Sequence, residues 1–236
     1  MPVEQTLTFG IAWFVVFVFS TTLHEAAHAF VALRLGDPTA YEGGQVTLNP
    51  LPHIRREPFG MVFVPLISFF LSGWMIGWAS APYNPVWAHA YPRRAAWMAI
   101  AGPASNLILV LLAAAAIRGG VMAGVFHPPS SVTFSHVVTA AVEGPAAAAA
   151  MILSVFFSLN LLLFAFNLLP VPPLDGSGAM PLLLSDDAAR RYRLVMSQPT
   201  LSLIGLVIAW RIFGVIFGPV HRTALNLLYY PLASYY

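Results

Sequence analysis

Two histidines and a glutamate lie close together in the sequence His24-Glu25-Ala26-Ala27-His28. In a helix, residues four apart lie on the same face, so His24 and His28 can direct imidazole nitrogens at one metal ion. Glu25 follows His24 directly and is near enough to polarise a water molecule at such a metal without being a ligand. The spacing is that of zinc peptidases, and it predicts a metal site with Glu25 as the general base.

The alternative, that these residues meet by chance, must be weighed against their surroundings. The motif lies near the end of a long apolar run, between segments 14–19 and 30–33. Two histidines and a carboxylate in such a segment are costly to bury unless they have a partner or a function. Because a metal ion supplies both, the apolar context favours the metal site.

The composition is that of a membrane protein. Of the 236 residues 58% are hydrophobic and 8% charged, with a mean hydropathy of +0.76, whereas soluble domains carry roughly 25% charged residues. We expect an all-α polytopic membrane protein, a bundle of about four to six membrane segments with a small membrane-embedded β-hairpin or sheet and a re-entrant segment. The net charge of +2 gives no sign of a nucleic-acid partner. The absence of cysteine excludes disulfides and thiolate ligands, so zinc would need histidine and carboxylate ligands.

The apolar runs predict helices over about 5–35, 95–117, 145–168 and 200–217, followed by an aromatic tail over 220–236 at a membrane interface. The first run lacks a basic leader region and a small-residue cleavage site, so we interpret it as a retained membrane helix. The whole chain, 1–236, is expected to form one integral membrane domain. Its core covers 7–184, and the C-terminal membrane helix and tail cover 185–236.

Segment 59–81 is apolar enough to span a membrane, but Pro65, Gly73 and Gly77 interrupt it. Arginine pairs precede and follow it, which indicates that both of its ends lie on one side. We therefore predict a re-entrant helix over 59–71 that returns through an extended segment over 74–82. Before it, segment 41–48 around Gly43-Gly44 is predicted to form a short strand or hairpin.

The arginines predict an orientation, because cytoplasmic loops are enriched in basic residues. With the N-terminus outside, only Arg118 and Arg222 fall outside, and Arg211 lies within the last helix. The inside set contains Arg34, Arg55, Arg56, Arg93, Arg94, Arg190, Arg191 and Arg193.

Asp175 is the best candidate for a third ligand, since a catalytic zinc commonly has three protein ligands and a water. It follows an apolar helix and a proline-rich extended run, and Gly176 allows close backbone approach. The alternative is that Asp175 caps a helix that begins at Gly176. With the HEAAH motif on another membrane helix, the ligand interpretation is favoured.

The HEAAH motif and the later Pro-Pro-Leu-Asp-Gly run, both in hydrophobic segments, resemble the site-2 protease family of intramembrane zinc metalloproteases. The resemblance covers about 7–184, including Ala-Gly-Pro-Ala-Ser-Asn at 101–106 and segment 46–50. It is closest to the compact bacterial branch without a PDZ domain. The chain departs from relatives at 78–82, where they often carry a lysine and a Pro-Val-Pro run, and at 55–56, where they tend to be acidic.

The resemblance implies an enzyme that binds Zn²⁺ and hydrolyses peptide bonds of transmembrane proteins or peptides, in a bacterial inner membrane with the active site towards the cytoplasm. It further implies lipid contacts, strand-like segments near Val46 and Trp78 that hold an unwound substrate, and a possible homo-oligomer. For the two asparagines in the implied site, an interhelical hydrogen bond is an alternative role. The implied residues are His24, His28 and Asp175 as zinc ligands, Glu25 as catalytic base, and Asn167 and Asn106 as substrate or oxyanion contacts.

An alternative function is a membrane zinc-binding or transport protein without peptidase activity. A transporter would be expected to place polar residues along a path through the bundle. This chain concentrates them towards one end, which favours the protease.

Overall fold

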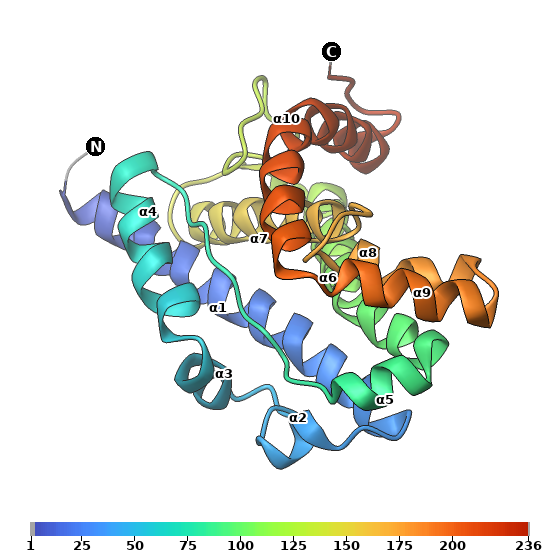
Figure 1. Cartoon of the computed structure of the whole chain (residues 1–236). Coiled ribbons are helices and arrows are strands. Elements are labelled where there is room, and N and C mark those ends of the chain that lie inside the picture. The colour runs from blue at the N-terminus through green and yellow to red at the C-terminus, as the bar shows by residue number, and fades with distance from the viewer. Residues whose placement is uncertain (1–2, 236) are drawn as a thin grey trace.

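The computed structural model describes residues 3–235, with side chains from residue 6 onward. In this part of the chain, four helices are long and apolar enough to cross a membrane. They are α1 (Val3–Arg34), α6 (Pro92–Met122), α7 (Pro145–Asn167) and α10 (Pro199–Tyr229) (Figure 1). The predicted class, an all-α polytopic membrane protein, is confirmed.

Helix α1 has one buried face and one exposed apolar face. Trp13 and Phe17 are buried and share a cluster with Val155 and Leu159 of α7. The opposite side carries a stripe of apolar residues four apart, which places them on one face of the helix. Such a stripe would be costly in water and is suited to lipid; its residues are Leu7, Ile11, Val15 and Phe19.

Helix α6 packs against both α1 and α7. Its buried face is rich in small residues, which allow the backbones of membrane helices to approach closely. Close approach matters here because α6 passes directly beside the HEAAH turn of α1. The small buried residues are Ala95, Ala96, Ala99, Gly102, Ser105 and Ala113.

The connection from α1 to α6 begins with α2 (Thr39–Glu42) and α3 (Pro50–Arg56). The predicted strand or hairpin over 41–48 is therefore wrong. The glycine pair ends a helix instead of turning a hairpin: Gly44 has φ 72°, and the amide of Gln45 returns to the carbonyl of Ala40 at 2.9 Å. That bond satisfies a helix-end carbonyl and leaves 43–48 as a loop.

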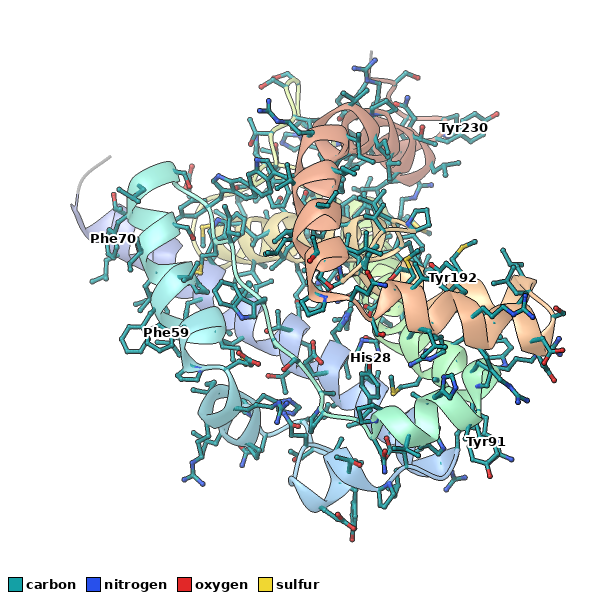
Figure 2. All side chains as sticks on the ribbon, in the orientation of Figure 1. His28, Phe59, Phe70, Tyr91, Tyr192 and Tyr230 are labelled. Atoms are coloured by element: carbon teal, nitrogen blue, oxygen red, sulfur yellow. The ribbon has the colours of Figure 1, made fainter. Side chains whose placement is uncertain are left out.

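The re-entrant shape predicted for segment 59–82 is confirmed. A π-helical turn, Phe59–Phe63, leads into α4 (Val64–Ser72), and the chain reverses at Gly73, where φ is 78°. It then returns as an extended segment to α5 (Pro85–Ala90) (Figure 1). Figure 2 shows Phe59 and Phe70 on the outer side of this hairpin, and both are exposed.

The returning segment is held at two levels, first by the π-helical turn and α1 and then by a residue just beyond the end of α1. Near its start, the amide of Trp78 donates to the carbonyl of Gly60 at 3.1 Å, and a Cβ at Gly77 would collide with Phe17 of α1. Near its end, the amide of Asn84 donates to the buried carboxylate of Asp37 at 2.8 Å. The segment therefore runs along α1 past the level of the HEAAH turn.

A two-stranded antiparallel sheet, β1 (Phe126–His127) with β2 (Thr139–Ala140), lies in the connection between α6 and α7. A small sheet was expected, but nearer the N-terminus. The segments near Val46 and Trp78 are not paired with each other as strands; the first is a loop and the second bonds to the π-helical turn.

The C-terminal part contains α8 (Asp175–Ala179), a 3-10 turn (Met180–Leu183), α9 (Asp186–Met196) and α10. The predicted end of the last helix at 217 is wrong, because α10 continues through Pro219 to Tyr229. A proline inside a helix removes a hydrogen bond and bends it, and α10 changes direction along its length (Figure 1). Beyond the bend, Tyr229 is buried and donates to the carbonyl of Val137 at 2.7 Å.

Candidate metal centre

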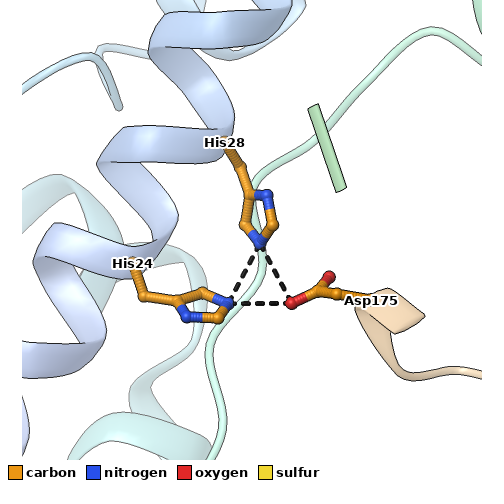
Figure 3. Close-up of side chains that lie close together, drawn as sticks. All are labelled: His24, His28 and Asp175. Atoms are coloured by element: carbon orange, nitrogen blue, oxygen red, sulfur yellow. Dashed lines mark hydrogen bonds and ion pairs between the residues drawn. The ribbon is translucent and has the colours of Figure 1, made fainter. Parts of the chain in front are cut away.

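His24 and His28 of α1 meet Asp175, the first residue of α8 (Figure 3). Nε2 of His24 lies 3.0 Å from Nε2 of His28 and 3.0 Å from Oδ2 of Asp175, and the third side of this triangle is 3.3 Å. The two imidazoles are buried, while the Asp175 side chain is 22% exposed. The structure thus brings the three predicted ligands together, with Asp175 the most exposed of them.

The Asp175 carboxylate does not cap α8. Leu174 occupies the N-cap position and the helix has no side-chain cap bond, so the alternative role for Asp175 is wrong. Close approach at Gly176 holds the loop, because a Cβ there would collide with the carbonyl groups of Leu168 and Leu169. As expected from the sequence, Gly176 allows the start of α8 to approach the end of α7 closely.

Two hydrogen bonds fix the protons of the imidazoles. Nδ1 of His28 lies 2.7 Å from the carbonyl oxygen of Met98, which can only accept, so this Nδ1 donates. Nδ1 of His24 lies 2.6 Å from Oδ1 of Asn106 and donates likewise. In the neutral rings both Nε2 atoms then present lone pairs to each other and to a carboxylate oxygen. Three acceptors this close repel one another unless a cation lies among them.

The size of the triangle fits zinc. Tetrahedral Zn²⁺ with ligand bonds of about 2.0–2.1 Å separates its ligand atoms by about 3.3 Å, close to the observed 3.0–3.3 Å. Gly102 of α6 faces the same point, and a Cβ there would collide with Nε2 of both histidines. The absence of a side chain at Gly102 leaves the room that an ion and its fourth ligand need.

The electrostatics keep the third ligand ionised. Burial raises the pKa of the Asp175 carboxyl, but the His28 and His24 imidazoles beside it, when protonated in the absence of a metal, outweigh burial and hold that pKa below its ordinary value. The carboxylate is therefore available as an anionic ligand at neutral pH.

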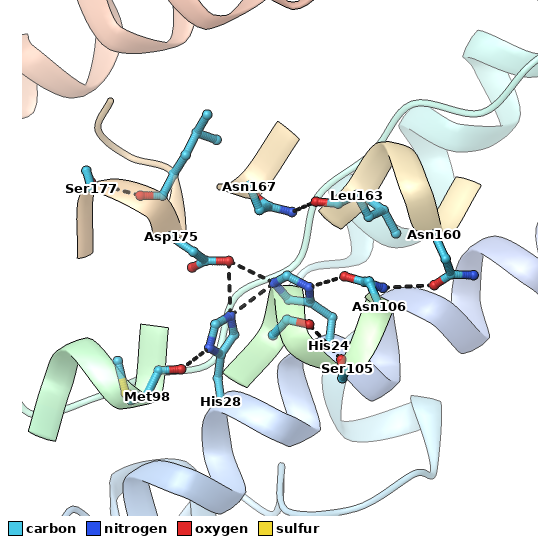
Figure 4. A network of polar contacts seen from close by, with 12 residues as sticks. His24, His28, Met98, Ser105, Asn106, Asn160, Leu163, Asn167, Asp175 and Ser177 are labelled. Atoms are coloured by element: carbon cyan, nitrogen blue, oxygen red, sulfur yellow. Dashed lines mark hydrogen bonds and ion pairs between the residues drawn. The ribbon is translucent and has the colours of Figure 1, made fainter. Parts of the chain in front are cut away.

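The other predicted site residues differ in their surroundings. Glu25 is 6% exposed, and within residues 6–235 its carboxylate has no hydrogen-bond partner. Asn106 is fully buried against His24, so it contacts a ligand directly. Asn167 donates to the carbonyl of Leu163 in its own helix at 3.0 Å and contacts none of the three ligands (Figure 4).

Sequence reasoning missed three residues that bear on this site: Met98, Gly102 and Asn160. The Met98 contribution is a backbone carbonyl, which no residue type reveals. Gly102 belongs to the 101–106 motif, but its role depends on how closely α6 approaches α1. Asn160 was detectable as an amide in the middle of an apolar helix, where a polar side chain needs a partner.

A family model described as peptidase family M50 matches residues 12–212, most of the 236 residues. The chain belongs to peptidase family M50. The predicted resemblance to the site-2 proteases is thereby confirmed, and the match supports zinc as the cofactor and a zinc metalloendopeptidase as the enzyme class.

Relatives from two bacterial groups agree with the M50 assignment. YwhC of Bacillus subtilis (strain 168), named as a zinc metalloprotease, is 35% identical over 160 residues, which cover 67% of this chain and 63% of YwhC. Rip2 of Mycobacterium tuberculosis (strain ATCC 25618 / H37Rv), named likewise, is 30% identical over 205 residues, 86% of this chain and 68% of Rip2. Rip2 of Mycolicibacterium smegmatis is 30% identical over 72% of this chain and 56% of its own length. The chain thus spans just under two thirds of YwhC. No solved structure gives a significant match.

Proposed function

We propose that this M50 chain is an intramembrane zinc metalloprotease that hydrolyses peptide bonds of transmembrane substrates. The observation that carries the proposal is the triangle of His24, His28 and Asp175, whose acceptor atoms converge between apolar helices beside the buried Glu25. A structural role would not require three acceptors to face one another.

His24, His28 and Asp175 would bind the zinc ion, and Glu25 would act first as general base and then as general acid. Bound zinc activates water for attack on a peptide carbonyl and polarises that carbonyl. Within residues 6–235 the Glu25 carboxylate has no competing hydrogen bond, so it can take one proton from the attacking water. It then passes this proton to the amide nitrogen as the C–N bond breaks, leaving a carboxylate and a free amine.

The extended segment 77–84 is the proposed support for the substrate. It runs along α1 past the histidines, and within residues 3–235 the amides of Ala79, Ser80 and Ala81 have no hydrogen-bond partner. An unwound substrate can satisfy such free amides by strand addition. Unwinding is required because a peptide bond in a helix is hydrogen-bonded and shielded. Asn167, near Asp175 at the end of α7, stays a candidate contact for the substrate or oxyanion.

Orientation and domain extent are part of the same proposal. The arginine-rich ends of α1 and α6, together with α3 and α9, would face the cytoplasm, with the site opening towards that side of a bacterial inner membrane. Residues 1–236 would act as one membrane domain with its catalytic core within 7–184. The substrate would be a transmembrane protein or peptide, and a homo-oligomer is compatible with this arrangement.

The test uses the purified 236-residue protein in liposomes with a labelled single-span reporter peptide. Wild type is expected to bind one zinc per chain and cleave the reporter. Glu25→Gln should retain zinc and lose cleavage by about 10²-fold or more, the loss of general-base catalysis. Glu42→Gln on α2, an exposed glutamate away from the site, is the matched control and should cleave like wild type.

Cleavage that survives Glu25→Gln would refute the assigned mechanism. Zinc-loaded wild type that cleaves no member of a panel of single-span peptides, but moves zinc into the liposomes, would instead establish the transport alternative.

A further inference from the structure

Behind His24, away from the metal position, lies a chain of buried polar side chains from three helices. Oδ1 of Asn106 accepts from His24, and Nδ2 of Asn106 donates to Oδ1 of Asn160 in α7 at 2.9 Å (Figure 4). Nδ2 of Asn160 donates in turn to Oγ of Ser20 in α1 at 3.0 Å and to the carbonyl oxygen of Phe156 at 2.8 Å. Ser20, Asn106 and Asn160 are each 0% exposed.

The Phe156 carbonyl, at the end of this hydrogen-bond network farthest from His24, decides which atoms donate and which accept. The carbonyl of Phe156 can only accept, so the Asn160 atom facing it must be the amide nitrogen. The Asn160 oxygen therefore faces Asn106 and can only accept, which turns the Asn106 nitrogen towards it. The Asn106 oxygen is then left for His24. Rotating either amide would set two acceptors or two donors against each other in a dry environment, where unmet polar groups are costly.

We propose that Asn160 is a positioning residue that selects the tautomer of His24 through Asn106. With Asn160 in place, His24 carries its proton on Nδ1 and keeps the Nε2 lone pair for the metal. The proposal rests on the proposed zinc site. The new element is that Asn160, which contacts neither the metal-binding residues nor the substrate, decides whether His24 is ready to bind the metal.

The corresponding group for His28 needs no such relay. Its Nδ1 donates directly to the backbone carbonyl of Met98, and a backbone carbonyl cannot rotate to present a donor. Only His24 depends on an amide side chain whose two ends can exchange. Tautomer loss at His24 and retention at His28 is therefore the signature that distinguishes this relay from a general loosening of the bundle.

The first experiment measures the tautomers in zinc-free protein by NMR with ¹⁵N-labelled histidine. Wild type is expected to show Nδ1–H at both His24 and His28. Asn160→Leu removes the amide at similar volume, frees Asn106 to rotate, and should give a mixture of tautomers at His24 alone. An unchanged His24 signal in this variant would overturn the proposal, whether or not the wild type proves to be a protease.

The second experiment measures Zn²⁺ affinity by competition with a chelating dye, and the visible spectrum of the Co²⁺-loaded protein. Removal of an outer-shell partner typically weakens metal binding about 10–100-fold, and that loss is expected for Asn160→Leu, with altered Co²⁺ bands. Ser154→Ala is the matched control in α7. It removes a buried side chain that bonds the amides of Val137 and Val138, away from His24, and should leave both readouts unchanged.

A double-variant comparison tests the route. If Asn160 acts only through Asn106, Asn106→Leu/Asn160→Leu should bind zinc as weakly as Asn106→Leu alone. Fully additive losses would show that Asn160 acts by another path and would refute the relay. Should Asn160→Leu fail to fold, Asn160→Ser, which is too short to bridge Asn106 and the Phe156 carbonyl, provides the same tests.

Discussion

The Cα atom of Gly102 faces Nε2 of His28 so closely that a Cβ at this position would overlap the nitrogen. Gly102 lies on α6 and His28 on α1, so this close contact between the two helices is also one wall of the candidate metal centre. The room for an ion depends on the absence of one methyl group.

Gly102→Ala is expected to reduce zinc affinity by on the order of 100-fold, the upper end of losses from changes around a ligand, because the methyl group would enter the space between the imidazoles. Chelator competition measures this loss. Gly119→Ala is the control in the same helix, where a Cβ meets nothing within 4 Å; there alanine should stabilise the helix slightly. Equal zinc affinity in both variants would contradict the assigned geometry.

Asp175→Ala should lower zinc content well below one ion per chain, because it removes one of three ligands and leaves two histidines that bind alone. Metal analysis of protein purified in detergent measures the stoichiometry. Asp187→Ala on α9, an exposed carboxylate, is the control. Full zinc occupancy in Asp175→Ala would place the third ligand elsewhere.

Zinc affinity should fall as the pH falls. Metal binding requires deprotonated imidazoles at His24 and His28, so protons compete with the ion. The pKa of Asp175 is held below its ordinary value, so this carboxylate stays ionised and adds no proton to the competition between pH 8 and pH 5. Titrations of zinc affinity across this range should approach a release of two protons per zinc at the acidic end. A pH-independent affinity would exclude histidine ligands.

Ala79→Pro is expected to raise the KM for a peptide substrate and leave zinc content unchanged, because proline removes an amide that strand addition would use. Ala79→Gly keeps the amide and serves as the control. Michaelis–Menten measurements with the liposome reporter separate the two. If Ala79→Pro and Ala79→Gly behave alike, the substrate does not pair with this amide.

Gly77→Ala should destabilise the protein by about 1–3 kcal/mol, the usual cost of overpacking, because the new methyl group would collide with the Gly60 carbonyl and with Phe17. Thermal unfolding in detergent measures the loss. Gly218→Ala in α10, where a Cβ meets nothing within 4 Å, should show no loss. A Gly77→Ala protein as stable as wild type would mean that the extended segment is not held tightly against α1.

The sequence predicted features that depend on residues close together in the chain, such as the histidine pair and the re-entrant segment. The four-residue spacing of His24 and His28 fixes their common face, and the proline run ends α7 before Asp175. The extended backbone expected in that run is wrong, because the run forms turns in which the amide of Leu174 donates to the carbonyl of Val171 at 3.0 Å. The interruptions at Pro65 and Gly73 and the arginines at both ends of the segment were enough to predict the re-entrant shape.

The errors and omissions concern contacts between distant segments. Gly43-Gly44 suits a hairpin turn and a helix end equally, and only the Gln45-to-Ala40 bond decides between them. Pro219 was expected to lie beyond the last helix, yet α10 tolerates it with a bend. Gly102 leaves space at the metal position and Asn160 bonds to Asn106 only because of how the helices pack, and residue spacing along the sequence does not reveal that packing.

The position of the HEAAH turn along α1 has a consequence for the products of the proposed cleavage. His28 and His24 come six and ten residues before Arg34, the last residue of the helix, which corresponds to about 9–15 Å at 1.5 Å per residue. A transmembrane substrate cut at that depth would be divided unequally. One fragment would keep most of its hydrophobic length and stay in the bilayer, whereas the other would carry only a short apolar end and could leave the membrane without extraction.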